Sequence, residues 1–267
     1  MRIIIPAAYR LTTAIEPMKT ILAVVPVIYF MVNEVSGQNR SYFGMEASIT
    51  NDVFEITETG DDLKTGPQTG GLWGFNLRQD ITSYFFIETG LIRKYYASGI
   101  GFKRPIDISF SGTSIDAWLI PLRLGTRVNL YKEKLYFVPV LGYSFCINTY
   151  YGYGSYGPSS GSAKTIDHSV SFSYTENTDL VKYFSLIQTG LGFEFILFKT
   201  VVLSVSTNYY TGFTKVIELN DITYTVDDSD SFTGESFSKG EFWSIGVGLK
   251  YPISNFWTKK VKSKGEL

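Results

Sequence analysis

His168 is the only histidine of the chain, and it stands between Asp167 and Ser169. Acyl transfer and hydrolysis need a histidine with a serine and an acid within hydrogen-bond reach. The His-x-Ser spacing of lipid A deacylases would place serine at position 170, where Val170 stands. We therefore expect His168 to be a solvated loop residue, and the sequence predicts no catalytic site and no enzyme.

Oxygen ligands crowd the last long connection between predicted strands, and these are the ligands that divalent cations prefer. They are Asp221, Asp227, Asp228, Asp230 and Glu235. Their spacing departs from the EF-hand pattern, because Phe232 stands where further ligands and a glycine belong. We expect a solvated loop there, with no metal and no other cofactor. The single Cys146 has no intramolecular disulfide partner and is expected to be a small buried thiol.

Tyrosines gather in another long connection, among several glycines and serines. They are Tyr150, Tyr151, Tyr153 and Tyr156. Tyrosine offers a large contact area at low entropy cost, and glycine and serine adapt to a partner. This segment is the candidate binding surface for a ligand or protein partner that the sequence does not identify.

Eight segments must position these connections, and each alternates apolar with polar or small residues. They are residues 43–53, 71–78, 85–94, 118–130, 136–149, 183–198, 201–214 and 242–251. The gaps between them alternate long and short, which puts both termini and all short turns at one end. The pattern predicts an all-β, eight-stranded, antiparallel, up-and-down transmembrane β-barrel over residues 38–256. The long gaps are expected to be extracellular loops.

The two faces of each segment decide between a barrel in lipid and a barrel in water. Trp243, Ile245, Val247, Leu249 and Tyr251 share one face of the last segment, opposite Ser244, Gly246, Gly248 and Lys250. Bulky apolar faces that end in aromatic residues favour contact with lipid. The alternative, a soluble ligand-binding barrel, requires the Trp243 face to line the interior.

With the apolar faces outside, charged residues point into the lumen. They are Glu46, Arg78, Glu88, Lys94, Arg123, Arg127, Glu194 and Lys250. Buried charges must be paired or hydrated, so we expect a polar network that plugs the barrel. A narrow channel whose selectivity is set by rings of charge is the alternative.

The two ends of the chain carry signals of their own. Residues 1–37 combine a basic start, an apolar run at 21–32 and a Val35-Ser36-Gly37 cleavage site, which predicts a signal peptide whose true start is Met18 or Met1. Residues 257–267 form a basic tail. Removal of residues 1–37 leaves 21 basic and 23 acidic residues, a net charge of −2 that argues against nucleic acid as a partner.

The segments Trp118-Leu119-Ile120-Pro121-Leu122 and Pro139-Val140-Leu141-Gly142, with the closing Gly246-Val247-Gly248-Leu249-Lys250-Tyr251, carry a family resemblance. They resemble the outer-membrane β-barrel family of Bacteroidetes, also called PorT-like, which has eight-stranded barrels like those of the OmpA type. The resemblance implies export to the outer membrane and contact with lipid, lipopolysaccharide and the barrel-assembly machinery. It implies a structural or surface-interaction role, with a component of a secretion or assembly machine as an alternative. The chain departs from the family pattern in its basic tail, since insertion signals usually end at a terminal aromatic residue.

Overall fold

The computed structural model of the protein describes residues 40–66, 68–103, 107–149, 151, 156–165, 167–178, 180–198, 200–227 and 231–253. The expected signal peptide and basic tail lie outside these residues. Within the described part of the chain, no helix is long and apolar enough to cross a membrane.

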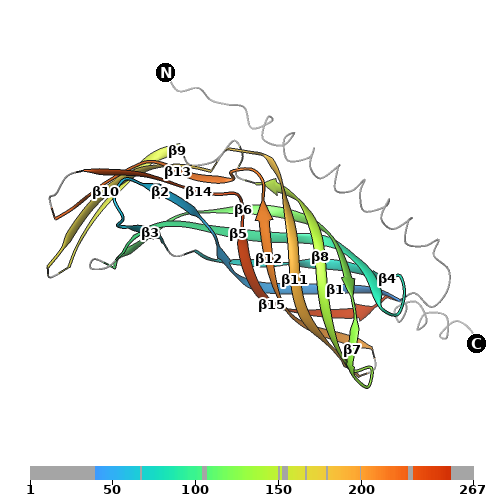
Figure 1. The fold of residues 1–267 in the computed structure, drawn as a ribbon. Coiled ribbons are helices and arrows are strands. Elements are labelled where there is room, and N and C mark those ends of the chain that lie inside the picture. Colours follow the sequence, from blue (N-terminus) through green and yellow to red (C-terminus); the bar gives the residue numbers. More distant parts are fainter. Residues whose placement is uncertain are drawn as a thin grey trace, which may run out of the picture. The chain divides into compact units, whose positions relative to one another are not determined.

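Eight antiparallel strands close on themselves as a barrel (Figure 1). In spatial order they are β1 (Ser41–Asp52), β4 (Thr69–Asp80), β5 (Phe85–Phe102), β6 (Ser109–Thr126), β8 (Leu135–Asn148), β11 (Tyr183–Leu197), β12 (Val201–Gly212) and β15 (Phe242–Pro252). The barrel closes where β15 pairs with β1, with Val247 opposite Ala47. The predicted fold, strand count and order are confirmed.

Short turns join the strands at one end of the barrel, which we call the turn end. They lie between β4 and β5, between β7 (Val128–Tyr131) and β8, and between β11 and β12. Ile253 donates a backbone hydrogen bond to Ser41, so the first and last barrel strands also meet at this end. The fourth predicted strand is interrupted at Arg127, and the short β7 pairs separately with β8.

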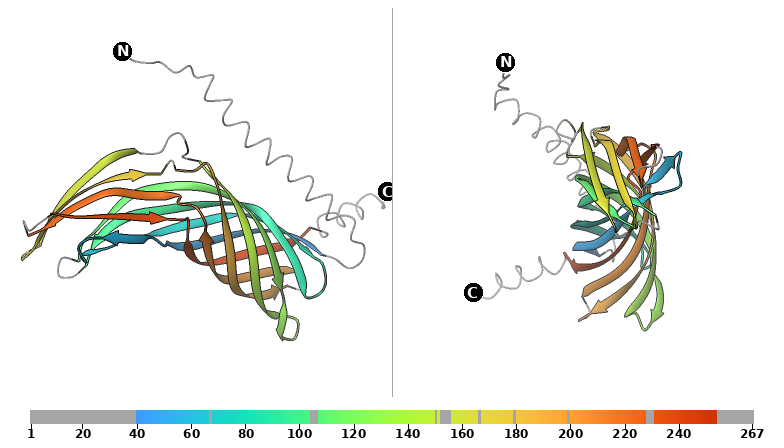
Figure 2. Two further views of the ribbon diagram at one scale, coloured as in Figure 1. Left: turned by 45° about the horizontal axis from the view of Figure 1, so that its top comes forward. Right: turned by 90° about the vertical axis from the view of Figure 1, so that its left-hand side faces the viewer.

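The long connections are not loops, contrary to the expectation from the sequence. Segments of three of them form a second antiparallel sheet beyond the end of the barrel opposite the turns, and most of the fourth, residues 95–117, extends β5 and β6 (Figures 1 and 2). This distal sheet has the order β2 (Glu55–Glu58), β14 (Phe232–Ser238), β13 (Ile217–Val226), β10 (Ser169–Asn177) and β9 (Tyr156–Lys164). A short β3 (Leu63–Thr65) pairs with the extended end of β5.

Two apolar clusters stabilise the distal half of the molecule, from the middle of the barrel to the distal sheet. The first, which we call the apolar seal, fills the distal end of the barrel and includes Ile92, Tyr96, Leu119, Tyr210 and Phe242. The second lies between the distal sheet and the extended ends of β3 and β5. Its buried members are Leu63, Ile100, Phe102, Val170, Phe172, Tyr174, Leu219, Ile222 and Tyr224. The distal sheet and the layer of β3 and the extended end of β5 therefore form a two-layer sandwich, because the strands of both layers bury alternate side chains in a common core.

Candidate functional site

The first group of inward-facing charges lies near the turn end of the lumen. The Arg78 guanidinium contacts Glu194 at 2.5 Å and Asp80 at 3.1 Å. Arg127 binds the same two carboxylates, at 3.1 Å and 2.8 Å. Arg78 also lies over the Phe86 ring, 3.3 Å from its centroid. Two cations and two anions thus form a closed group that joins β4 and β11 across the lumen.

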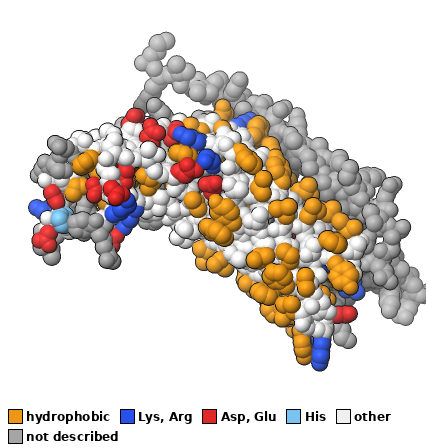
Figure 3. Space-filling view, in the orientation of Figure 1, with side chains coloured by type: hydrophobic (Ala, Val, Ile, Leu, Met, Phe, Trp, Pro, Cys, Tyr) orange, Lys and Arg blue, Asp and Glu red, His pale blue; other side chains and the backbone are white. Residues whose placement is uncertain are grey.

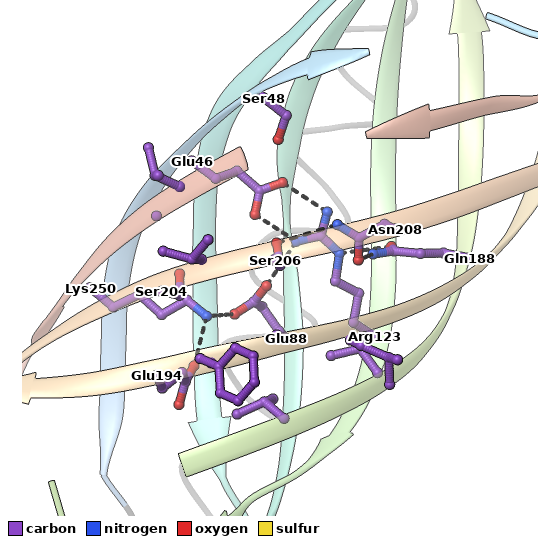
Figure 4. Close-up of a pocket in the computed structure, with 18 of the residues that line it drawn as sticks. Glu46, Ser48, Glu88, Arg123, Gln188, Glu194, Ser204, Ser206, Asn208 and Lys250 are labelled. Carbon is purple, nitrogen blue, oxygen red and sulfur yellow. Dashed lines mark hydrogen bonds and ion pairs between the residues drawn. The ribbon is translucent and has the colours of Figure 1, made fainter. Parts of the chain in front are cut away.

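Arg123 on β6 organises the middle of the lumen (Figure 4). It donates to both oxygens of Glu46 at 2.7 Å and 2.8 Å, which is the bidentate geometry of a strong pair. It also contacts Glu88 at 2.8 Å and donates to Gln188 at 2.9 Å. Its side chain therefore bridges strands from opposite sides of the barrel.

Lys250 on β15 joins the middle group to the turn-end group. Its Nζ lies 2.7 Å from Glu88 and 3.4 Å from Glu194. The complete chain of pairs contains four cations, Arg78, Arg123, Arg127 and Lys250, and four carboxylates, Glu46, Asp80, Glu88 and Glu194. We call it the lumen network. Its charges balance, and mutual pairing offsets the large cost of removing each from water.

Lys94 does not join the lumen network, although the sequence predicted it among that set. It pairs with Asp52 at 2.6 Å, and both side chains are fully buried. Asp52 also accepts the Ala97 amide at 2.7 Å. Lys94 lies 4.1 Å from the centroid of the Tyr96 ring, so this pair is embedded in the apolar seal.

Sequence reasoning missed Asp80 and Asp52, and one signal could have found both. Each continues the two-residue period of an inward face, Asp80 after Arg78 and Asp52 after Glu46. Asp80 lies two residues beyond the end of the predicted segment 71–78. Gln188 and Asn208 also extend the network, joined by a 2.9 Å hydrogen bond, and Tyr210 lies 3.4 Å from Arg123.

Small residues on β11, β12 and β15 make room for the long charged side chains of the facing wall. They are Gly190, Gly192, Ser204, Ser206, Gly246 and Gly248. A cavity of about 60 Å³ remains beside Ser204 and Ser206, lined by polar residues such as Glu46 and Arg123 and by apolar ones such as Phe86. Its volume and the polar part of its lining suit a few bound water molecules.

The apolar seal closes the lumen on the distal side of the network. Tyr210 stacks on Phe242 with a centroid distance of 4.2 Å, and Tyr96 meets Phe242 edge-on at 5.9 Å. Cys146 belongs to this cluster and is a buried free thiol. Ion pairs therefore occupy the lumen from the turn end to its middle, and aromatic packing fills it at the distal end.

His168 lies in the turn between β9 and β10, at the end of the distal sheet and outside the lumen. Its Nδ1 is 2.6 Å from Asp227, and Asp227 also accepts the Ser169 amide at 2.7 Å. These hydrogen bonds hold the pKa of the Asp227 carboxyl below its usual value, the bond to His168 contributing most. In the same sheet, burial and a hydrogen bond to Glu58 raise the pKa of Tyr224.

The remaining candidate residues are only partly described. Tyr151 is half exposed, and Tyr156 begins β9. Tyr150 and Tyr153 lie outside the described residues, as do Asp228 and Asp230. No group of three metal-ligating side chains occurs among the residues that the structure describes.

The outer wall of the barrel carries an apolar band (Figure 3). Ile245 is 68% exposed and Trp243 53%, whereas Ser244 and Lys250 on the opposite face are buried. This confirms the predicted faces and excludes a soluble barrel with the Trp243 face inside. An eight-stranded barrel with an apolar exterior and a polar interior is a transmembrane β-barrel of the outer-membrane type.

No protein-family model matches the chain, and no curated protein does. Solved outer-membrane proteins resemble it distantly in structure. OprG of Pseudomonas aeruginosa is 13% identical, with a TM-score of 0.43 over 80% of this chain and 95% of OprG. Ail of Yersinia pestis, an attachment invasion locus protein, is 14% identical, with a TM-score of 0.33 over 80% of this chain and all of Ail. The Escherichia coli outer membrane protease OmpT is 8% identical, with a TM-score of 0.28 over 80% of this chain and 94% of OmpT. The fold assignment therefore rests on strand pairing and the apolar band.

Proposed function

We propose that the protein is a non-catalytic outer-membrane barrel that anchors the distal sheet at the outer surface of the cell. The filled lumen is the observation that carries this proposal. Four cations are matched by four carboxylates in the network, and the apolar seal lies above them. A barrel packed in this way is a scaffold, because side chains occupy the path that a solute would take.

The distal sheet supplies the surface for interaction. It is built from the connections that follow β1, β8 and β12, and its inner face shares an apolar core of nine buried residues with β3 and the extended end of β5. A sheet packed on such a core presents a fixed surface, since the packed strands hold the exposed side chains in register. Rigid scaffolds that carry a separate surface for partners are a common arrangement for binding proteins.

The surroundings of His168 support a non-catalytic role. Its described polar contacts are Asp227 and the Thr165 backbone and hydroxyl, a turn and ion-pair arrangement at a sheet end. Val170 is buried in the distal core. No serine hydroxyl is hydrogen-bonded to the His168 ring among the contacts of the described residues. These contacts fix the turn between β9 and β10, which is a structural role.

The proposal is tested by single-channel recording of the refolded protein in planar bilayers. We expect no conductance steps from the native protein. A narrow channel is the second candidate, favoured by the cavity that remains in the lumen beside Ser204 and Ser206. In a gated channel, Arg123→Ala with Arg127→Ala raises conductance, whereas in a filled scaffold the double variant loses stability and stays silent.

The matched control for that experiment is Lys132→Ala with Lys134→Ala, which removes the same charge from exposed turn positions. Its recordings should equal those of the native protein. Regular conductance steps in the native protein that change with Arg123 and Arg127 but not with the turn lysines would overturn the scaffold proposal.

A further inference from the structure

The barrel and the distal part of the molecule meet at a level where the strands lose their regularity, which we call the junction. Two strands, β5 and β6, run through it from the barrel into the part beyond (Figures 1 and 2). The other connections leave strand conformation there among their described residues, for example at 53–54 between β1 and β2 and at 239–241 between β14 and β15. The β5–β6 pair is therefore the continuous arm that joins the two parts.

Strand pairing within the arm is weakest at the junction. On one side, β4 pairs with β5 as far as Tyr95 and β3 pairs only from Ile100 onward, so no described strand pairs with residues 96–99 there. On the other side, the register with β6 shifts between Ala97 and Gly99, because β6 has one residue more over this stretch. Such a bulge disrupts the ladder and bends the strand. Residues 96–99 are therefore the point at which the arm can bend.

The two apolar clusters confirm that this stretch lies between separately packed bodies. Tyr96 belongs to the apolar seal, whereas Ile100 belongs to the core between the two layers of the sandwich. On β6, Ile115 belongs to the seal and Phe110 packs against the sandwich core. A few residues of each strand thus link the two cores without belonging to either.

Asp52, the last residue of β1, takes the place of the missing strand beside β5. One of its carboxylate oxygens accepts a hydrogen bond from the Ala97 amide at 2.7 Å, and the other accepts one from the Lys94 ammonium at 2.6 Å. Lys94 also donates to the Tyr95 carbonyl at 2.6 Å. Asp52 and Lys94, which we call the junction lock, thus tie β5 to β1 where β4 no longer pairs.

A second polar contact holds the junction from the distal side. Glu176, near the end of β10, accepts a hydrogen bond from Ser98 at 2.6 Å, and both residues are buried. Gly112 of β6 lies against this contact, because a Cβ at that position would come within 2.5 Å of the Ser98 hydroxyl. Neighbouring residues of β5 are therefore held from opposite sides, Ala97 by the barrel and Ser98 by the distal sheet.

Stability alone does not explain the junction lock. Its two charges are removed from water inside the apolar seal, where Lys94 lies 4.1 Å from the centroid of the Tyr96 ring and 4.8 Å from that of Phe242. Apolar residues of similar volume often replace a buried ion pair with no loss of stability, and the best-attested role of such a pair is to select one arrangement of the chain. Here the directed bonds to Ala97 and Tyr95 select the direction in which β5 leaves the barrel.

We propose that the junction is a hinge, and that Asp52 and Lys94 lock it so that the distal sheet is held at one angle to the barrel. This inference rests on the proposed function, because it concerns how the surface for interaction is presented. Without the lock, the arm bends at residues 96–99 while the seal and the sandwich core each stay packed. The alternative is a joint that apolar packing fixes by itself, in which removal of the lock leaves the angle unchanged.

The test measures the distance between two spin labels by pulsed electron paramagnetic resonance of the full chain in lipid vesicles. The labels are attached at Thr189→Cys on the outer wall of the barrel and at Asp167→Cys on the turn between β9 and β10, both exposed positions. Cys146 is buried, and the chain without added cysteines measures any label that it takes up. We expect a narrow distance distribution with the lock present, and one at least twofold wider in Asp52→Leu/Lys94→Met.

The matched control is Thr50→Val, which removes a buried hydroxyl two residues before Asp52 and leaves the lock intact, so its distribution should equal that of the native protein. Faster migration of the unboiled protein on a denaturing gel shows that a variant has a closed barrel. If Asp52→Leu/Lys94→Met lacks this mobility, Asp52→Asn/Lys94→Met replaces it, because asparagine keeps an acceptor for the Ala97 amide, and the distribution should again widen. An unchanged distribution in the folded lock variant, or equal widening in Thr50→Val, overturns the inference.

Bilayer recordings of the same preparations keep this inference apart from the proposed function. Conductance of the native barrel contradicts the proposed function, whereas the distance distributions decide the hinge whether or not the lumen conducts.

Discussion

Arg123 shows what can and cannot be read from single residues. Its inward direction follows from the alternation of Leu122 and Leu124 with Arg123 and Gly125. Its partners could not be predicted, because Glu46 lies 77 positions away in sequence and meets Arg123 only across the closed lumen. Alternation fixes the face of a residue, whereas closure and register decide its neighbours.

Replacing Arg123 by leucine should lower the free energy of unfolding by about 3–5 kcal/mol, since Glu46 and Glu88 are then left buried without their guanidinium. Urea titration in lipid vesicles measures this loss. Adding Glu46→Gln should restore part of it, because three cations then face three carboxylates and Glu88 keeps Lys250 at 2.7 Å, and Lys134→Ala on the exposed turn is the control. A change within about 0.5 kcal/mol of the native value would contradict the structural importance of the network.

Asp227 makes the distal sheet sensitive to acid. Its pKa is lowered in the folded state by His168 and the Ser169 amide, so its contribution is complete above the unfolded pKa of about 3.9. The contribution is lost as pH falls through the lower folded pKa. Protection of the Ser169 amide from hydrogen exchange, measured by NMR, should therefore fall below about pH 4. In Asp227→Asn this dependence should be absent; the same pH profile in both proteins would refute the assignment.

Among the elements, the barrel strands were predictable and the distal sheet was not. Long alternating segments with aromatic ends identify strands that face lipid on one side. The distal strands are shorter, richer in Ser and Gly, and follow predicted barrel strands, so their pattern predicts loops. Their signal was nevertheless present, because Val170, Phe172 and Tyr174 alternate with serines and all three are buried.

The two kinds of sheet should respond differently to an added charge. Val247 faces outward near the middle of β15, and lysine there should cost about 2–4 kcal/mol of unfolding free energy in lipid. Thr57→Lys on exposed β2 should be nearly neutral, because water solvates the ammonium. Urea titration in vesicles distinguishes the two. Equal effects at both positions would mean that the apolar band does not contact lipid.

At the scale of the whole molecule, the closed barrel predicts heat-modifiable mobility. A barrel that keeps its strand pairing in detergent migrates compactly, and boiling unfolds it. We expect faster migration of the unboiled protein on a denaturing gel, and recovery in the outer-membrane fraction of cells. Recovery as a soluble protein with unchanged mobility would contradict both the membrane placement and the exposed band.

The order of the distal sheet has a consequence for biogenesis. β2 comes from the first long connection, and its partner β14 comes from the last one. Gly234 can therefore meet Glu58 only after the chain has been synthesised as far as β14, which includes every barrel strand except β15. Contacts so distant in sequence form late, because a large loop must be ordered first. An antibody that recognises the β2–β14 pair would therefore count only finished molecules, and would distinguish them from chains arrested during insertion.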